Sequence, residues 1–210
     1  LVFAGERGED VDPAEFDTVI GAAVDECVAR QMAAGVDLVS DGEMSKISYA
    51  TYIKDRITGF DGDSARTPPA DLEDFPGFLR RQASSGGTPT YLRPCCVGTI
   101  APKTLAPLEA DLRHLSAAIE RNSPIGAFMN AAAPGVIALF HPDEFYGDSD
   151  TYLEALAEAM RPEYEAIVEA GFVLQLDSPD LGLGRHMMYK DRTEAEFLAS
   201  GDPELLPHQV

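Results

Sequence analysis

The sequence predicts an α/β fold with parallel strands, and three observations support this prediction. Amphipathic stretches with an apolar residue every three or four positions alternate with short apolar segments. The clearest short segment, residues 172–177, is almost continuously apolar, which is typical of a parallel strand buried on both faces. Polar residues follow several of these segments, at the positions where parallel strands present active sites.

The composition is typical of a globular domain and disfavours nucleic-acid-binding and membrane proteins. The 210 residues fit one domain, and 45% of them are hydrophobic, which is enough for a sizeable core. The formal net charge of -20, from 36 acidic and 16 basic residues, disfavours binding to nucleic acid or anionic lipid. No apolar run is long enough to span a membrane, and the charged N-terminus is not typical of a signal peptide.

The three cysteines predict a reducing, cytoplasmic compartment. Their number is odd and two of them, Cys95 and Cys96, are adjacent, which makes a poor disulfide framework. Adjacent cysteines also lack the spacing typical of a zinc site. Because both lie in an apolar segment, we expect buried structural thiols rather than a nucleophile.

The first predicted element is a helix that begins after Asp12, whose side chain is suited to cap it, with Pro13 in the first turn. Apolar residues recur at helical spacing from Phe16 to Met32, and Gly35 is a natural C-terminal stop. A short strand at residues 36–40 follows. The chain therefore opens with a helix-to-strand unit.

The same patterns predict four further elements before the strand at 172–177, namely a strand at 91–97, a helix at 104–122, a strand at 125–129 and a helix at 151–170. Residues 61–90 are rich in Pro, Gly, Ser and charge, and predict a long excursion loop with local structure or a role as a lid. Residues 130–135 read as a small-residue turn. About four strands are too few for a complete eightfold barrel, which typically needs about 250 residues. The pattern predicts a small open sheet or part of a barrel.

Polar clusters follow three of the predicted strands. These are Asp41 and Glu43, then Asn130, then Asp177, Ser178 and Asp180. Such side chains bind an amine, act as acid or base, or orient a ligand, although each alone is as well explained as a cap of the next helix. Three clusters together favour a site. The four histidines form no metal-binding motif, and His114, in the middle of a helix, is expected at the surface.

Two segments resemble the catalytic barrel of the cobalamin-independent methionine synthase family. They are Gly35–Glu43 (GVDLVSDGE) and Leu174–Leu181 (LQLDSPDL). Residues 45–50 and 127–135 resemble the shorter, single-barrel branch, which includes proteins similar to epoxyalkane:coenzyme M transferases. The resemblance covers roughly residues 3–200. It implies a partial TIM (β/α)8 barrel that lacks the first strand and the C-terminal part.

The resemblance also implies a chemistry, the transfer of a methyl group from a 5-methyltetrahydrofolate-type donor to a thiol such as homocysteine. Glu43 and Asp177 would hold the amino group of the thiol substrate, with Asp41, Asn130 and Ser178 in the same substrate site. In the family, zinc activates the thiol as thiolate.

The family's zinc ligands lie downstream of the Asp177 segment, where this chain has no cysteine, so we expect no zinc site and no methyl transfer by this chain alone. One alternative is alkyl transfer to coenzyme M or another thiol. A non-catalytic alternative is a half-barrel that acts as a binding or assembly module and self-associates through exposed barrel edges.

Overall fold

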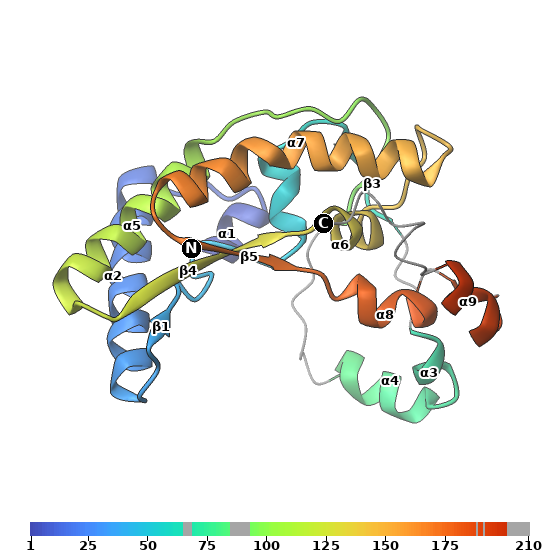
Figure 1. Cartoon of the computed structure of the whole chain (residues 1–210), viewed down its shortest axis with the longest axis horizontal. Coiled ribbons are helices and arrows are strands. Elements are labelled where there is room, and N and C mark those ends of the chain that lie inside the picture. Colours follow the sequence, from blue (N-terminus) through green and yellow to red (C-terminus); the bar gives the residue numbers. More distant parts are fainter. Residues whose placement is uncertain (65–68, 85–92, 188, 191, 201–210) are drawn as a thin grey trace.

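The computed structural model describes residues 1–64, 69–84, 93–187, 189–190 and 192–200. A parallel sheet of order β1-β4-β5 lies at its centre, formed by Leu38–Val39, Gly126–Ala132 and Val173–Asp177 (Figure 1). In its register Val39 lies opposite Ala127, and Ala132 opposite Asp177. Helices connect these strands, as parallel pairing requires. The predicted α/β class with a parallel sheet is confirmed.

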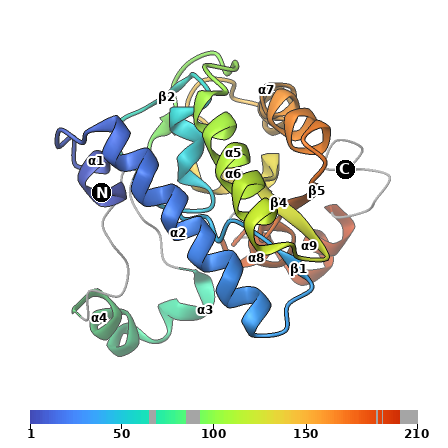
Figure 2. The ribbon, with the colours of Figure 1, turned by 90° about the vertical axis from the view of Figure 1, so that its left-hand side faces the viewer.

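Three long helices cover one face of this sheet, namely α2 (Pro13–Ala33), α5 (Ala106–Asn122) and α7 (Ser149–Glu169). Figure 2 shows α2 and α5 side by side, and Figure 1 shows α7 running along the strands. Alternate residues of β4, among them Met129 and Ala131, are buried against Val24, Leu115 and Ile167 of the helices. This period-two alternation leaves the intervening residues of each strand on the opposite face, where the candidate site lies.

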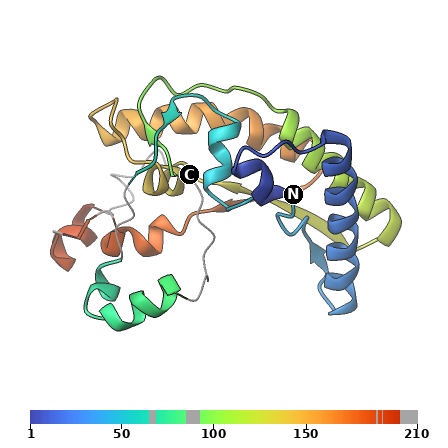
Figure 3. The same ribbon diagram turned by 180° about the vertical axis from the view of Figure 1, so that it is seen from behind.

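The remaining elements flank the sheet, and they are α1 (Val2–Glu6), η1 (Thr51–Asp55), β2 (Phe60–Asp61), α3 (Ala70–Glu73), α4 (Pro76–Ser84), β3 (Cys95–Cys96), α6 (Pro134–Phe140), α8 (Asp180–Met187) and α9 (Glu194–Ser200). A second core joins η1, α6 and α7 through Ile53, Ile137 and Leu156. Seen from in front and from behind, α3, α4, α8 and α9 gather beyond the end of β5 (Figures 1 and 3). None of the described helices combines the length and apolarity that a membrane span requires.

The helix predictions agree with the structure. Helix α2 begins after Asp12, whose carboxylate accepts hydrogen bonds from Ala14 N at 2.8 Å and Glu15 N at 3.0 Å. Gly35 and Gly171 follow α2 and α7 with positive φ, the conformation that stops a helix at low steric cost. Within residues 61–90, the described part contains α3 and α4, so this excursion has local structure of its own. Residues 65–68 and 85–90 lie outside the described part.

Two strand predictions are wrong in position. The segment at 91–97 is not part of the parallel sheet: Cys95 and Cys96 pair antiparallel with β2, while Tyr91 and Leu92 lie outside the described residues. A short apolar run fits either arrangement, so its pattern does not distinguish them. Residues 130–132, expected in a turn, continue β4, and helix α6 then begins at Pro134. Asn130 therefore lies within a strand rather than after one.

Two predictions of exposure are also wrong. Strand β5 is not buried on both faces, since Val173 is 60% and Leu176 40% exposed, and within the described residues β5 pairs only with β4. His114 is buried rather than at the surface, because α5 packs against α2 beside Gly21. There its Nε2 lies 3.0 Å from Asp17 Oδ1. Cys95 and Cys96 are buried as expected, and burial raises the pKa of both thiols.

Candidate functional site

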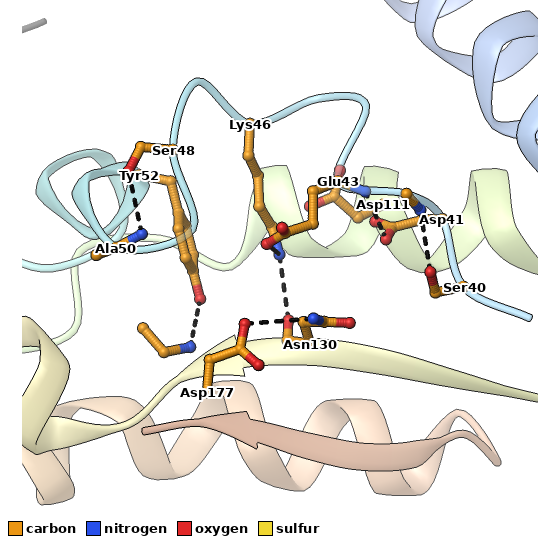
Figure 4. Close-up of polar contacts among 12 residues, drawn as sticks. Ser40, Asp41, Glu43, Lys46, Ser48, Ala50, Tyr52, Asp111, Asn130 and Asp177 are labelled. Carbon is orange, nitrogen blue, oxygen red and sulfur yellow. Dashed lines mark hydrogen bonds and ion pairs between the residues drawn. The ribbon is translucent and has the colours of Figure 1, made fainter. Parts of the chain in front are cut away.

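The candidate site lies on the sheet face that the long helices leave uncovered. Asn130 of β4 lies opposite Gln175 of β5, and Asp177 is the last residue of β5. The loop that follows β1 runs above these residues and contributes Glu43 and Lys46 (Figure 4). The ends of three parallel strands thus bring together residues from distant parts of the sequence, as the strand-end argument predicts.

The loop after β1 is held in an unusual conformation. Gly42 and Glu43 both have positive φ, of 65° and 55°, and Glu43 is a residue type that rarely adopts such a value. The Asp41 carboxylate supports this turn by accepting a hydrogen bond from Glu43 N at 3.0 Å. Gly42 is sterically required, since a Cβ at this position would lie 2.5 Å from the Cys27 sulfur. The turn directs the Glu43 side chain toward β4 (Figure 4).

Lys46 lies between the loop and the sheet. Its Nζ donates a hydrogen bond to the Asn130 carbonyl oxygen at 3.1 Å and lies 3.7 Å from Glu43 Oε1. The same ammonium group lies 4.6 Å from the centre of the Tyr52 ring, within range of a cation–π interaction. Only 2% of the Lys46 side chain is exposed, whereas 30% of the Glu43 side chain is exposed. Glu43, not Lys46, is therefore the accessible charge.

Asp177 is the second accessible carboxylate of the site. Its Oδ2 accepts a hydrogen bond from Asn130 Nδ2 at 3.2 Å, and its Oδ1 accepts one from Gln175 Nε2 at 3.2 Å. Its backbone carbonyl accepts a hydrogen bond from Ala133 N at 3.1 Å, which fixes the end of β5 beside the start of α6. Two amide groups thus orient the carboxylate toward the pocket, and neither of them carries a charge.

An open pocket of about 470 Å3 lies between the loop and the end of β5, and its walls are Glu43, Tyr49, Gln175, Leu176, Asp177, Ser178 and Pro179. Three of the five predicted substrate residues, Glu43, Asp177 and Ser178, therefore line one pocket. Asn130 contacts Asp177 from β4. Asp41 is only 2% exposed; its carboxylate supports the Glu43 turn and does not line this pocket.

Burial and mutual repulsion set the ionisation of the loop carboxylates. Burial raises the pKa of Glu43; nearby Lys46 opposes this shift, and Asp177 and Asp41 add to it. Burial likewise raises the pKa of Asp41, again opposed by Lys46. Glu43 thus interacts with two further carboxylates and one lysine, which leaves a local excess of negative charge when all are ionised. Such a site favours a ligand with a positively charged group.

A buried network that the sequence analysis missed adjoins the site through Tyr52, whose ring Lys46 contacts. The Tyr52 hydroxyl donates to Glu163 Oε1 at 2.8 Å and accepts from Ala132 N at 3.1 Å. Arg56 lies 4.5 Å from the same ring and pairs with both Asp111 and Glu163. These residues come from η1, α5, α7 and β4, so only the tertiary structure brings them together. No local pattern in the sequence marks this network, whose members lie up to 111 positions apart.

The described residues do not fit the zinc that the family resemblance implies. Among them, no three His, Cys, Asp or Glu side chains come together as a metal-binding group. At the site, the Glu43 carboxylate pairs with the Lys46 ammonium instead. We therefore derive no step of the chemistry through zinc.

The fold places the chain among α/β proteins whose parallel sheet matches part of a (β/α)8 barrel, although the strands described do not close into one. Among solved structures, the chain is similar to a B12-independent methionine synthase from Shewanella sp. W3-18-1 in complex with selenomethionine, with a TM-score of 0.61 and 19% sequence identity. The match covers 80% of this chain and 44% of that chain, so the chain spans less than half the length of this neighbour.

No family model and no curated protein matches the sequence. At 19% identity, the structural likeness supports the methionine synthase resemblance at the level of the fold.

Proposed function

We propose that this chain binds an amino acid with a thiol or thioether side chain, and that this is the substrate-binding part of a methyl transfer to a thiol. The observation that carries the proposal is the pair of carboxylates, Glu43 and Asp177, that line one pocket. A primary ammonium group has three donors, and two carboxylates satisfy it by charge-assisted hydrogen bonds.

The rest of the pocket suits the body of such a ligand. Tyr49, Leu176 and Pro179 provide apolar surface for an aliphatic chain that carries sulfur, and the Ser178 hydroxyl adds one polar group. The solved neighbour was determined with selenomethionine, an amino acid of this shape, and this supports the same ligand class here. Homocysteine as acceptor and a methyltetrahydrofolate-type donor follow from the family resemblance.

Transfer to coenzyme M receives less support from the site. Its sulfonate is an anion, and the two accessible charges of the pocket are both negative. Lys46 is the nearest cation to Glu43, but its ammonium is buried against Asn130 and is not presented to the pocket. A cationic head group is therefore the better match.

Isothermal titration calorimetry at pH 7 tests the proposal. L-methionine and L-homocysteine should bind the 210-residue chain, whereas 3-(methylthio)propionate, which lacks the amino group, and 2-mercaptoethanesulfonate should bind at least tenfold more weakly. The variants Glu43→Gln and Asp177→Asn should each lose about 10- to 100-fold in affinity for L-methionine, since each removes one charge-assisted interaction of about 1.5–3 kcal/mol.

Asp37→Asn provides the matched control, because Asp37 is an exposed carboxylate directly before β1 and away from the pocket. Its affinity for L-methionine should be unchanged. Equal binding of L-methionine and the deaminated analogue would refute the role of the carboxylate pair.

The edge strand β5 favours a second candidate, an assembly module, because apolar side chains are exposed along it. Val173 and Leu176 on β5 are 60% and 40% exposed, and Leu181 of α8, just beyond the strand, is 62% exposed. Apolar side chains beside an edge strand promote pairing with another chain. Sedimentation velocity should then show concentration-dependent dimers that Val173→Lys weakens. A monomer at all concentrations would exclude this candidate and leave the binding proposal untouched.

A further inference from the structure

Lys46 is a buried lysine beside an open pocket. Only 2% of its side chain is exposed, although its partner Glu43 lines the pocket. Its ammonium makes three separate contacts, with the Glu43 carboxylate, the Asn130 carbonyl oxygen and the Tyr52 ring. These partners belong to the loop after β1, to β4 and to η1.

The contacts of Lys46 reach both carboxylates of the pocket. One contact is direct, because Lys46 Nζ lies 3.7 Å from Glu43 Oε1. The other runs through Asn130, whose carbonyl accepts from Lys46 and whose side-chain amide donates to Asp177 Oδ2. Figure 4 shows the lysine side chain extending from the loop down to β4, with the Glu43 carboxylate beside its end and Asp177 lower, at the sheet.

Tyr52 provides a fixed support under the ammonium group. Its hydroxyl donates a hydrogen bond to Glu163 Oε1 and accepts one from Ala132 N. The Arg56 guanidinium lies 4.5 Å from the ring centre, so the ring contacts two buried cations. A lysine in such a frame has little freedom to leave, because a buried ammonium without its partners is strongly unfavourable.

We propose that Lys46 is a positioning residue: its buried ammonium fixes the Glu43 carboxylate and the Asn130–Asp177 pair so that together they form a preset site for one ammonium group. This inference rests on the proposed function. Lys46 does not contact the ligand. It holds the residues that do.

The charge of Lys46 affects the ionisation of Glu43, which an uncharged side chain of similar shape would not do. Among the described residues, Lys46, Asp177 and Asp41 act on Glu43. Burial and the two aspartates raise the pKa of Glu43, and Lys46 opposes that rise. Removing the lysine charge therefore moves the pKa of Glu43 upward. Ammonium binding needs the ionised carboxylate, so the pH at which binding is half-maximal should move upward as well.

The test compares Lys46→Met, which keeps the length but removes the charge, with Lys46→Arg, which keeps the charge. The 13C resonance of the Glu43 carboxyl group, followed against pH in the ligand-free protein, should titrate at higher pH in Lys46→Met and near the wild-type pH in Lys46→Arg. Affinity for L-methionine at pH 7 should fall about tenfold in Lys46→Met, and affinity for 3-(methylthio)propionate should stay the same.

The outcomes separate this inference from the proposed function. An unchanged Glu43 titration in Lys46→Met overturns the role of Lys46. A shifted titration in a protein that binds no amino acid keeps the Lys46–Glu43 coupling and refutes the proposed ligand. If Lys46→Met does not fold, the wild-type chain decides: the 15N resonance of the Lys46 ammonium should move as Glu43 titrates, and a resonance that does not move refutes the inference.

Discussion

Replacing Arg56 by methionine should destabilise the protein strongly. Arg56, Asp111 and Glu163 are 5%, 4% and 3% exposed, and the guanidinium lies 2.6 Å from Asp111 Oδ2 and 2.9 Å from Glu163 Oε2. Arg56→Met would leave two buried carboxylates without their cation. Removing one partner of a buried ion pair costs about 3–5 kcal/mol, a large part of the 5–15 kcal/mol that typically stabilises a domain.

Urea denaturation followed by circular dichroism measures this change, since the chain has no tryptophan to report by fluorescence. With a slope of about 2 kcal/mol per M, the midpoint should fall on the order of 2 M. Arg161→Met is the matched control, because Arg161 pairs with Glu158 on the surface of α7, with both side chains more than half exposed. Its midpoint should not change measurably. Equal midpoints for the two variants would refute the role assigned to the buried network.

Three further predictions concern the loop and the buried titratable groups. Gly42→Ala should destabilise the protein by at least about 1–2 kcal/mol, because residue 42 has a left-handed φ. The new Cβ would also clash with the Cys27 sulfur, and Cys27→Ala should relieve that part of the loss. A double-mutant cycle measured by urea denaturation would show this coupling. Burial raises the pKa of Asp41 above its ordinary 3.8, so its ionisation opposes folding; the stability of Asp41→Asn relative to wild type should therefore grow as pH rises through that raised value, and a pH-independent difference would contradict this. Burial lowers the pKa of His141 from 6.5 to about 4. The contribution of the neutral imidazole to the free energy of unfolding is therefore fully present above pH 6.5 and should fall by about 3 kcal/mol as the pH drops to 4. A histidine NMR titration and unfolding measurements at each pH would check this.

The sequence predicts the long helices well because their signals are local. Helix α2 has a capping aspartate, a proline in its first turn and a glycine with positive φ just beyond its end, and the structure follows all three. The short strands carry less information. The composition of residues 130–132 predicts a turn, yet Ala132 pairs with Asp177 in the sheet, and that pairing depends on a segment 45 positions away.

The candidate site divides in the same way. Glu43, Asp177 and Ser178 line one pocket, and their positions after strands could be predicted, because parallel strands end at the same edge wherever the helices between them lie. Tyr52 lies in a short 3-10 helix and Arg56 directly follows it, and neither segment has a periodic pattern that would mark a buried polar side chain in the sequence. Their partners come from other elements, so their role depends on tertiary packing.

The alternation of side chains along β4 explains how one short strand serves both core and site. Met129 and Ala131 point to the helices and are almost fully buried, whereas Asn130 between them points to the opposite face and donates to Asp177. The carbonyl of the same residue accepts from Lys46, which connects the strand to the loop that carries Glu43. Because the helices fix the buried residues of β4, they also fix the position of Asn130. The geometry of the carboxylate pair thus depends on core packing, and a change in volume at Met129 should weaken ligand binding as well as stability.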